Sequence, residues 1–229
     1  MNDIFNENVP LKTETPAFAK HVLPAVPSSE VYLEDCVTAL KRYTDNHFDL
    51  AIVDPPYSIS IENSGTMFKK FGDTKGWDNE LPNKEYWEQL FRVSKNQIVW
   101  GGNYFIEYLT NTKCIIWWDK MNGTNMMADG EMAWTSFNKH CKRFQMHHFS
   151  SGYDAKIHPT QKPVKLYEWI LKEFAQEGDK ILDTHLGSGS IAIACHDYGF
   201  DLTACELNKE YFNKAMERIT NHTNQTKLF

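Results

Sequence analysis

The chain has 229 residues, of which 41% are hydrophobic and 24% are charged, and its mean hydropathy is −0.53. These values fit one α/β domain with a substantial core and exclude a disordered or fibrous protein. No apolar run approaches the roughly 20 residues of a membrane span, and the first residues lack the pattern of a secretory signal, so we expect a cytoplasmic protein without a membrane partner. A net charge of −6 does not by itself indicate a nucleic-acid partner. The five cysteines form no CxxC pair and predict reduced thiols, with neither a disulfide framework nor a metal site.

The hydrophobic pattern predicts an extended arm over residues 1–28, a main domain over 29–222 and a tail over 223–229. Strands are expected where short β-branched and aromatic runs occur, at 31–33, 49–53, 97–100, 114–118, 131–137, 180–183 and 201–206. Helices are expected between them, at 36–43, 84–94, 163–176, 190–198 and 208–221. This alternation predicts an α/β fold with a mostly parallel, seven-stranded sheet, and the strands within 114–137 predict one antiparallel hairpin at its edge.

The expected strand at 49–53 ends in Asp54-Pro55-Pro56-Tyr57. The two prolines fix the backbone and remove two N–H donors, so this turn presents carbonyls, a carboxylate and an aromatic ring. Such a turn suits a planar group that carries N–H donors. A tight turn with a capping Asp and a core Tyr is the plainer alternative, but the position at the end of a buried strand favours a functional site.

The stretch 179–208 contains a strand that ends at Asp183, a turn with Gly187 and Gly189, and a second strand that ends at Glu206. Glycines let the backbone approach a ligand, and a carboxylate about 20 residues beyond the first strand suits a ribose diol. Taken alone, this spacing also fits an NAD enzyme or a glycine turn without any ligand.

The segment Lys156-Ile157-His158-Pro159-Thr160-Gln161-Lys162-Pro163-Val164 leads into the expected helix at 163–176. Its polar side chains gather at a helix N-terminus, where carboxylates are favoured. An ordinary proline-bounded cap is the alternative.

Together, the three segments resemble the DNA amino-methyltransferases that use S-adenosylmethionine. In that family the DPPY tetrapeptide marks the catalytic loop, a glycine turn marks cofactor binding, and an HPTQKP-type segment precedes a helix beside the cofactor. Here the catalytic motif comes first, which resembles the β class, with its circularly permuted order and Rossmann-like sheet. One position departs from the family pattern, because His185 stands where the family usually has Phe.

The resemblance implies methyl transfer to the N6 amine of a flipped-out adenine in double-stranded DNA, with S-adenosylmethionine as cofactor. It implies a catalytic loop of Asp54, Pro55, Pro56 and Tyr57. It implies that Glu206 binds the ribose hydroxyls, Asp35 the adenine edge, and the segment Thr160, Gln161 and Lys162 the methionine carboxylate. The remaining implied cofactor residues are Asp183, His185, Gly187 and Gly189.

The sequence leaves several alternatives open. N4 methylation of cytosine is one, although the family then more often has Ser in place of Asp54. A non-catalytic DNA-binding module of the same fold, an RNA methyltransferase and a protein-glutamine methyltransferase are others.

Target recognition is expected in two polar segments, near 60–80 and 138–157, which we expect to overhang the active-site edge. The expected DNA contacts are Lys69, Lys70, Lys75, Lys139, Lys142 and Arg143. From 138 to 165 the chain has six basic residues and one acidic residue, although such a run is usually a solvated face. Because the second segment is short, we also expect a homodimer. The last residues, Gln225–Phe229, resemble peptides that bind a bacterial sliding clamp, although folding back onto the domain is the plainer alternative.

Overall fold

The computed structural model describes residues 27–58, 81–123, 128–147 and 156–224. These residues form one eight-stranded sheet in the order β1-β8-β7-β2-β3-β5-β4-β6. The strands are β1 (Ser29–Leu33), β2 (Phe48–Val53), β3 (Ser94–Trp100), β4 (Ile115–Asp119), β5 (Gly130–Thr135), β6 (Lys142–Gln145), β7 (Lys180–Asp183) and β8 (Asp201–Glu206). The helices are α1 (Cys36–Leu40), α3 (Lys84–Val93), α4 (Val164–Phe174), α5 (Ser190–Tyr198) and α6 (Lys209–Thr223), with a short 3-10 turn, η2 (Gly102–Tyr104).

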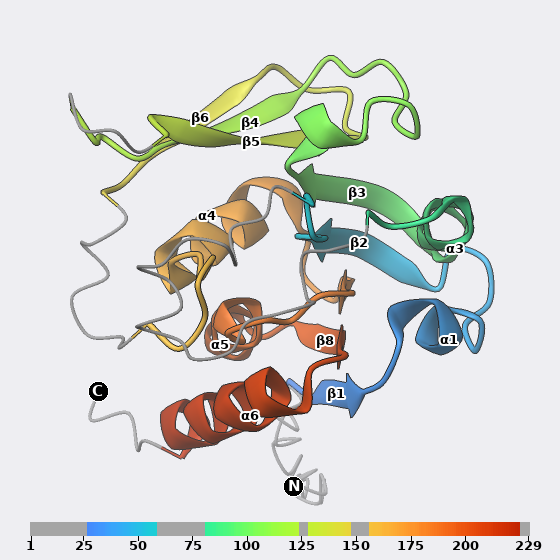
Figure 1. Ribbon diagram of the computed structural model, residues 1–229, viewed down its shortest axis with the longest axis vertical. Coiled ribbons are helices and arrows are strands. Elements are labelled where there is room, and N and C mark those ends of the chain that lie inside the picture. The colour runs from blue at the N-terminus through green and yellow to red at the C-terminus, as the bar shows by residue number, and fades with distance from the viewer. Residues whose placement is uncertain (1–26, 59–80, 124–127, 148–155, 225–229) are drawn as a thin grey trace, which may run out of the picture.

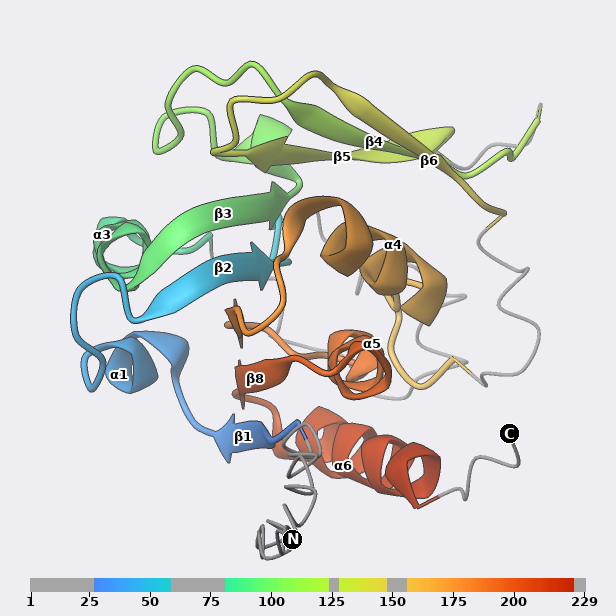
Figure 2. The same cartoon turned by 180° about the vertical axis from the view of Figure 1, so that it is seen from behind.

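The helices cover both faces of the sheet, with α1 and α3 on one face and α4, α5 and α6 on the other (Figures 1 and 2). The side chains of β2 show why. Leu50 and Ile52 pack among α4, α5 and α6, whereas Ala51 and Val53 pack against α1 and α3. A strand that is buried on both sides is apolar at every position, so the run Leu50–Val53 specifies a central strand.

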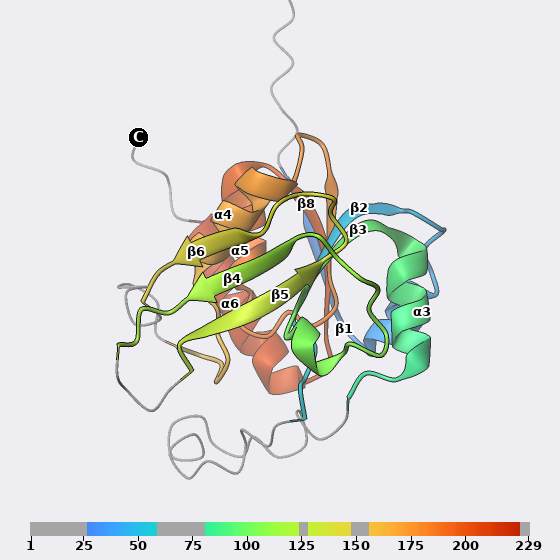
Figure 3. The ribbon, with the colours of Figure 1, turned by 90° about the horizontal axis from the view of Figure 1, so that it is seen from above.

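The expected α/β fold is confirmed, and all seven predicted strands are present. The predicted number of strands is wrong by one, because β6 pairs in parallel with β4 and forms the edge of the sheet. The predicted antiparallel hairpin of β4 and β5 is also confirmed, but it lies inside that edge. Figure 3 shows β6, β4 and β5 crossing the top of the molecule.

The two strands that carry the main motifs are neighbours. β2 pairs in parallel with β7, with Leu50 opposite Ile181 and Ala51 opposite Leu182. On its other side β7 pairs with β8. The strand that follows β7 in the chain, β8, and the strand that follows β2, β3, therefore lie on opposite sides of the β7–β2 pair, which makes this pair a topological switch point. Ligands bind at such a switch point, beyond the carboxyl ends of the strands. The fold therefore brings the DPPY turn and the glycine turn together.

Among the described helices, none combines the length and the apolar composition that a membrane crossing requires.

Candidate active site

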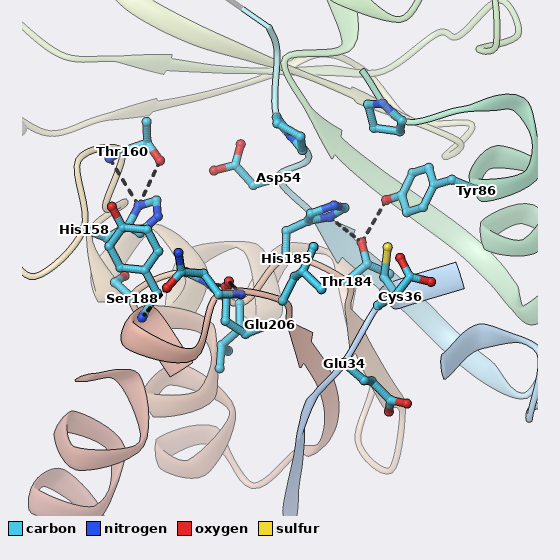
Figure 4. A pocket seen from close by; sticks show the side chains of 18 of the residues that line it. Glu34, Cys36, Asp54, Tyr86, His158, Thr160, Thr184, His185, Ser188 and Glu206 are labelled. Atoms are coloured by element: carbon cyan, nitrogen blue, oxygen red, sulfur yellow. Dashed lines mark hydrogen bonds between the residues drawn. The ribbon is translucent and has the colours of Figure 1, made fainter. Parts of the chain in front are cut away.

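A cavity of about 690 Å³ lies at the carboxyl ends of β1, β2, β7 and β8. The loops after these four strands, the segment before α4 and residues 81–86 at the start of α3 contribute its walls. Figure 4 shows the side chains of Asp54, His185 and Glu206 converging on it. Nine of the residues expected in the site line this cavity: Asp35, Asp54, Pro56, Thr160, Gln161, Lys162, His185, Gly187 and Glu206. Its size is that of a pocket for a small molecule such as a nucleoside-bearing cofactor.

Aromatic rings hold the DPPY turn in place. The Tyr57 hydroxyl donates a hydrogen bond to Oδ1 of Asp54. One face of the Tyr57 ring stacks on Tyr104 of η2, with ring centroids 4.9 Å apart. Gly101 lies so close to the ring that a Cβ there would be 2.2 Å from it. Tyr57 is thus fixed from two sides and orients the Asp54 carboxylate, while Pro55 is buried beside it.

Asp54 also belongs to a row of alternating charges. The ammonium of Lys162 forms an ion pair with Oδ2 of Asp54 and lies 3.2 Å from Oε2 of Glu131. Oε1 of Glu131 in turn pairs with Lys120. Burial alone would raise the pKa of Glu131, but Lys162 and Lys120 lower it to about 2. Burial alone would lower the pKa of Lys162, but Asp54 and Glu131 hold it above its ordinary value.

The resemblance implied a place for Lys162, and for its ammonium, near the methionine carboxylate of the cofactor, and that assignment stays a prediction. The structure places that ammonium between two protein carboxylates. Glu131 and Lys120 were missed altogether. The only signal in the sequence was a charged residue near the start of an otherwise apolar strand, at Glu131.

Glu206 and the glycine turn form the opposite part of the cavity. Oε2 of Glu206 accepts the Gly187 N–H at 2.9 Å, and Oε1 accepts the Asn208 N–H at 2.8 Å. Burial raises the pKa of Glu206, while these backbone donors oppose the rise. Gly189 is the N-cap residue before α5 and has a positive φ of 73°, and a Cβ there would lie 3.0 Å from Ile219. Its role in the described structure is close helix packing.

Asp183 and His185 lie between these two ends. Asp183 is buried and accepts the His185 N–H at 3.0 Å, and burial raises its pKa to about 7. Burial lowers the pKa of His185 to about 4, so its ring is neutral. Nδ1 of that ring lies 2.8 Å from the Thr184 hydroxyl, which lies 2.8 Å from the Tyr86 hydroxyl. Thr184 and Tyr86 also line the cavity, and the sequence had not identified them.

Asp35 and the segment before α4 complete the walls. Oδ1 of Asp35 accepts the Thr38 N–H at 2.8 Å and so caps α1. His158 is buried against the Tyr211 ring, and burial lowers its pKa to about 3. Its Nδ1 lies 3.2 Å from the Thr160 hydroxyl. This neutral histidine positions the segment rather than adding a charge.

The expected DNA-binding residues lie in two different places. The segment near 60–80, with Lys69, Lys70 and Lys75, is outside the described residues, as are residues 1–26 of the arm and residues 225–229 of the tail. Lys139 and Lys142 do not overhang the cavity. Because β5 is antiparallel to β3, β5 finishes at the end of the sheet that is opposite the cavity. There the Lys139 ammonium donates a hydrogen bond to the Glu173 carbonyl of α4, and Lys142 forms an ion pair with the Glu173 carboxylate.

Arg143 is exposed on β6, one residue further along the chain. β6 then runs back toward the active-site edge, because it is parallel to β4. The expectation that the whole second segment overhangs the site is therefore wrong for its first residues, because they follow β5, which runs antiparallel to β3.

Comparison with known proteins agrees with this geometry. A family model described as DNA methylase matches residues 99–217, which include Glu131, Lys162 and Glu206. The type II methyltransferase M2.DpnII of Streptococcus pneumoniae is 39% identical over 252 residues, covering 83% of this chain and 90% of that protein.

Two solved structures share the fold. The M1.HpyAVI–SAM complex aligns with a TM-score of 0.60 at 20% identity, over 84% of this chain and 99% of that one. The PvuII DNA methyltransferase, named as cytosine-N4-specific, aligns with a TM-score of 0.53 at 15% identity, over 87% and 93% of the two chains. Because the family match spans more than half of the chain and the pneumococcal relative extends over most of it, the chain belongs to the DNA methylase family.

Proposed function

We propose that this protein transfers a methyl group from S-adenosylmethionine to the N6 amine of adenine in double-stranded DNA. The observation that carries this proposal is the presence of Asp54 and Glu206 in one cavity, at the ends of β2 and β8. One carboxylate suits an exocyclic amine, and the other suits a ribose diol.

Asp54 and the Pro55 carbonyl accept the two hydrogens of the target amine. The lone pair of an adenine amine is delocalised into the ring, so the amine is a poor nucleophile. Two acceptors pull the nitrogen toward a tetrahedral geometry and orient its lone pair. Tyr57 holds the Asp54 carboxylate in place through its hydroxyl. Bound S-adenosylmethionine supplies the methyl group.

The cavity fits that cofactor in its donor groups as well as its volume. Glu206 and Asp35 present carboxylates for the ribose and the adenine edge, and Gly187 lets the chain approach the methionine part. Thr160 and Gln161 face the same part, next to the neutral His158. We assign Lys162 to the target base instead, because of its ion pair with Asp54.

The target adenine has to leave the duplex, since its amine is unreachable within the stack. We propose that the segment 60–80, with its lysines, and the part of the chain from Arg143 to 157 contact DNA. Phosphate contacts by these cations make binding fall steeply with salt. Reversal of the charge at Arg143 with no loss of DNA affinity would argue against the second part.

The modified nucleoside decides between adenine and cytosine as the target. The purified protein is incubated with radiolabelled S-adenosylmethionine and genomic DNA from a methylation-deficient strain, and the labelled nucleoside is identified after digestion. We expect N6-methyladenine. Labelled N4-methylcytosine would support the alternative, for which the shared fold with an N4-specific enzyme leaves room. The absence of label in DNA, with label in RNA or protein, would refute the proposal.

Two proposals concern assembly. A homodimer predicts about twice the chain mass of 26.6 kDa by light scattering, and a value equal to the chain mass would refute it. For the proposed clamp contact of Gln225–Phe229, the free peptide is expected to bind purified sliding clamp, and deletion of these residues is expected to leave the melting temperature unchanged.

A further inference from the structure

At the Asp54 end of the cavity, four charged side chains form a row of alternating sign: Lys120, Glu131, Lys162 and Asp54. The separations are 2.5 Å from Lys120 Nζ to Glu131 Oε1 and 3.2 Å from Glu131 Oε2 to Lys162 Nζ, and the ion pair of Lys162 with Asp54 ends the row. Two positive charges thus balance two negative ones. Removal of the charge of any one of these four side chains leaves a net charge next to the reacting groups.

Lys162 is the most deeply buried member of the row. Its side chain is 3% exposed, and its ammonium lies 5.1 Å from the centroid of the Trp100 ring. A buried ammonium is unfavourable unless a counter-ion accompanies it. Lys162 therefore needs a carboxylate partner in every state of the site.

The present arrangement leaves Asp54 engaged. Its Oδ1 accepts a hydrogen bond from Tyr57, and its Oδ2 pairs with Lys162. If the Asp54 carboxylate accepts a hydrogen bond from the target amine, as in the proposed function, the amine competes with the Lys162 ammonium for that carboxylate. The base can displace that ammonium only if Lys162 has another partner within reach.

We propose that Glu131 is a positioning residue that provides this second partner, so that Lys162 neutralises Asp54 until the target amine arrives and then shifts onto Glu131. The distance favours this shift, since Glu131 Oε2 already lies 3.2 Å from Nζ and a small rotation of the lysine stem closes the contact. Lys120 keeps Glu131 in place from the other side. The inference rests on the proposed role of Asp54.

The test compares Glu131→Gln with the double variant Glu131→Gln/Lys162→Met in the full-length protein. Gln keeps the shape of Glu131 but removes its charge, so Lys162 stays on Asp54. The single variant leaves the row with an excess positive charge, whereas the double variant restores the balance. Glu173→Gln is the matched control, because Glu173 also pairs with a lysine but lies at the opposite edge of the sheet.

Single-turnover methylation of genomic DNA from a methylation-deficient strain is measured together with the dissociation constant of S-adenosylmethionine and the melting temperature. The loss of one charged hydrogen bond predicts a transfer rate about tenfold to a hundredfold lower in Glu131→Gln. Cofactor affinity is expected to stay unchanged, and the double variant is expected to be faster than the single one. Glu173→Gln is expected to keep the wild-type rate.

Three results would overturn the inference: a wild-type rate in Glu131→Gln, a loss of cofactor affinity that matches the loss of rate, or a double variant slower than the single one. In each case a wild-type protein that forms N6-methyladenine leaves the proposed function standing. A wild-type protein that does not methylate DNA refutes the proposed function and the inference with it.

Discussion

Replacement of Gly101 by Ala tests whether Tyr57 has to be held in place for methyl transfer. Gly101 follows β3, and its N–H donates to the Met132 carbonyl at 2.9 Å, so its backbone is anchored to β5. A new Cβ would lie 2.2, 2.5 and 2.8 Å from three carbons of the Tyr57 ring. Favourable carbon contacts begin at about 3.5 Å, so the ring has to move by about 1.3 Å.

That displacement breaks the alignment of the Tyr57 hydroxyl with Asp54. A misplacement of about 1 Å in a catalytic site costs roughly a hundredfold in rate, which is about 2.7 kcal/mol in the barrier. We therefore expect the single-turnover rate of Gly101→Ala to fall about a hundredfold. The dissociation constant of S-adenosylmethionine, measured by calorimetry, is expected to stay unchanged, because Glu206 lies on another strand.

The control has to separate this overlap from backbone strain. Gly101 has a φ of 66°, and an alanine in that conformation is strained by about 1–2 kcal/mol whatever surrounds it. Gly123 has a φ of 65° but nothing within 4 Å of its Cβ position. Gly123→Ala thus carries the same strain without the overlap. Equal transfer rates in the two variants would refute the role assigned to Tyr57.

The remaining predictions separate the two ends of the cavity and the ionisation of its centre. Asp54→Ala is expected to abolish methyl transfer and to keep cofactor affinity. Glu206→Ala is expected to raise the cofactor dissociation constant about 30-fold, because it loses about 2 kcal/mol in charged hydrogen bonds. Equal losses of cofactor affinity in the two variants, measured by calorimetry, would contradict this division of roles. Because burial lowers the pKa of His185 to about 4, the folded state is destabilised as the pH falls below about 6.5. When the pH is lowered from 7 to 5, the free energy of unfolding of His185→Phe, measured in thermal melts, is expected to rise by about 1–2 kcal/mol relative to that of the wild type. A difference between the two proteins that does not change with pH would disprove this. Burial raises the pKa of Asp183 to about 7. The contribution of its protonated carboxyl to the stability of the folded state is therefore fully present below about pH 4 and is lost as the pH rises through 7. The stability of Asp183→Asn relative to the wild type is therefore expected to increase between pH 5 and pH 8, and a decrease would contradict the raised pKa.

The central sheet was predictable because its strands are buried on both faces and therefore apolar throughout. β6 was not, since Lys142–Gln145 spans only four residues, has Phe144 as its one apolar residue and contains no β-branched residue. The placement of Lys139 and Lys142 depends on the direction of β5. The sequence predicted the antiparallel hairpin of β4 and β5 but did not indicate which of the two strands runs antiparallel to β3.

The candidate site was predictable where function resides in a local motif. The turns after β2 and β7 hold Asp54 and Gly187 within a few residues of strand ends, and the fold brings those ends together. The contact between Lys162 and Asp54 joins residues 108 positions apart, and Glu131 comes from a third element. Long-range ion pairs of this kind depend on how whole helices and strands pack together, so the spacing of residues in the sequence does not predict them.

The pairing of β1 with β8 has a consequence for the order in which the protein can be completed during synthesis. β1 is the first of the described strands to be made, but its neighbour in the sheet is β8, residues 201–206, which is the last of them. β2 likewise gains β7 only after some 130 further residues have been made. Such long separations between partners delay folding. A nascent chain that stops short of β8 therefore has the DPPY turn but no Glu206 opposite it, so the cavity is complete only after the last described strand has been made.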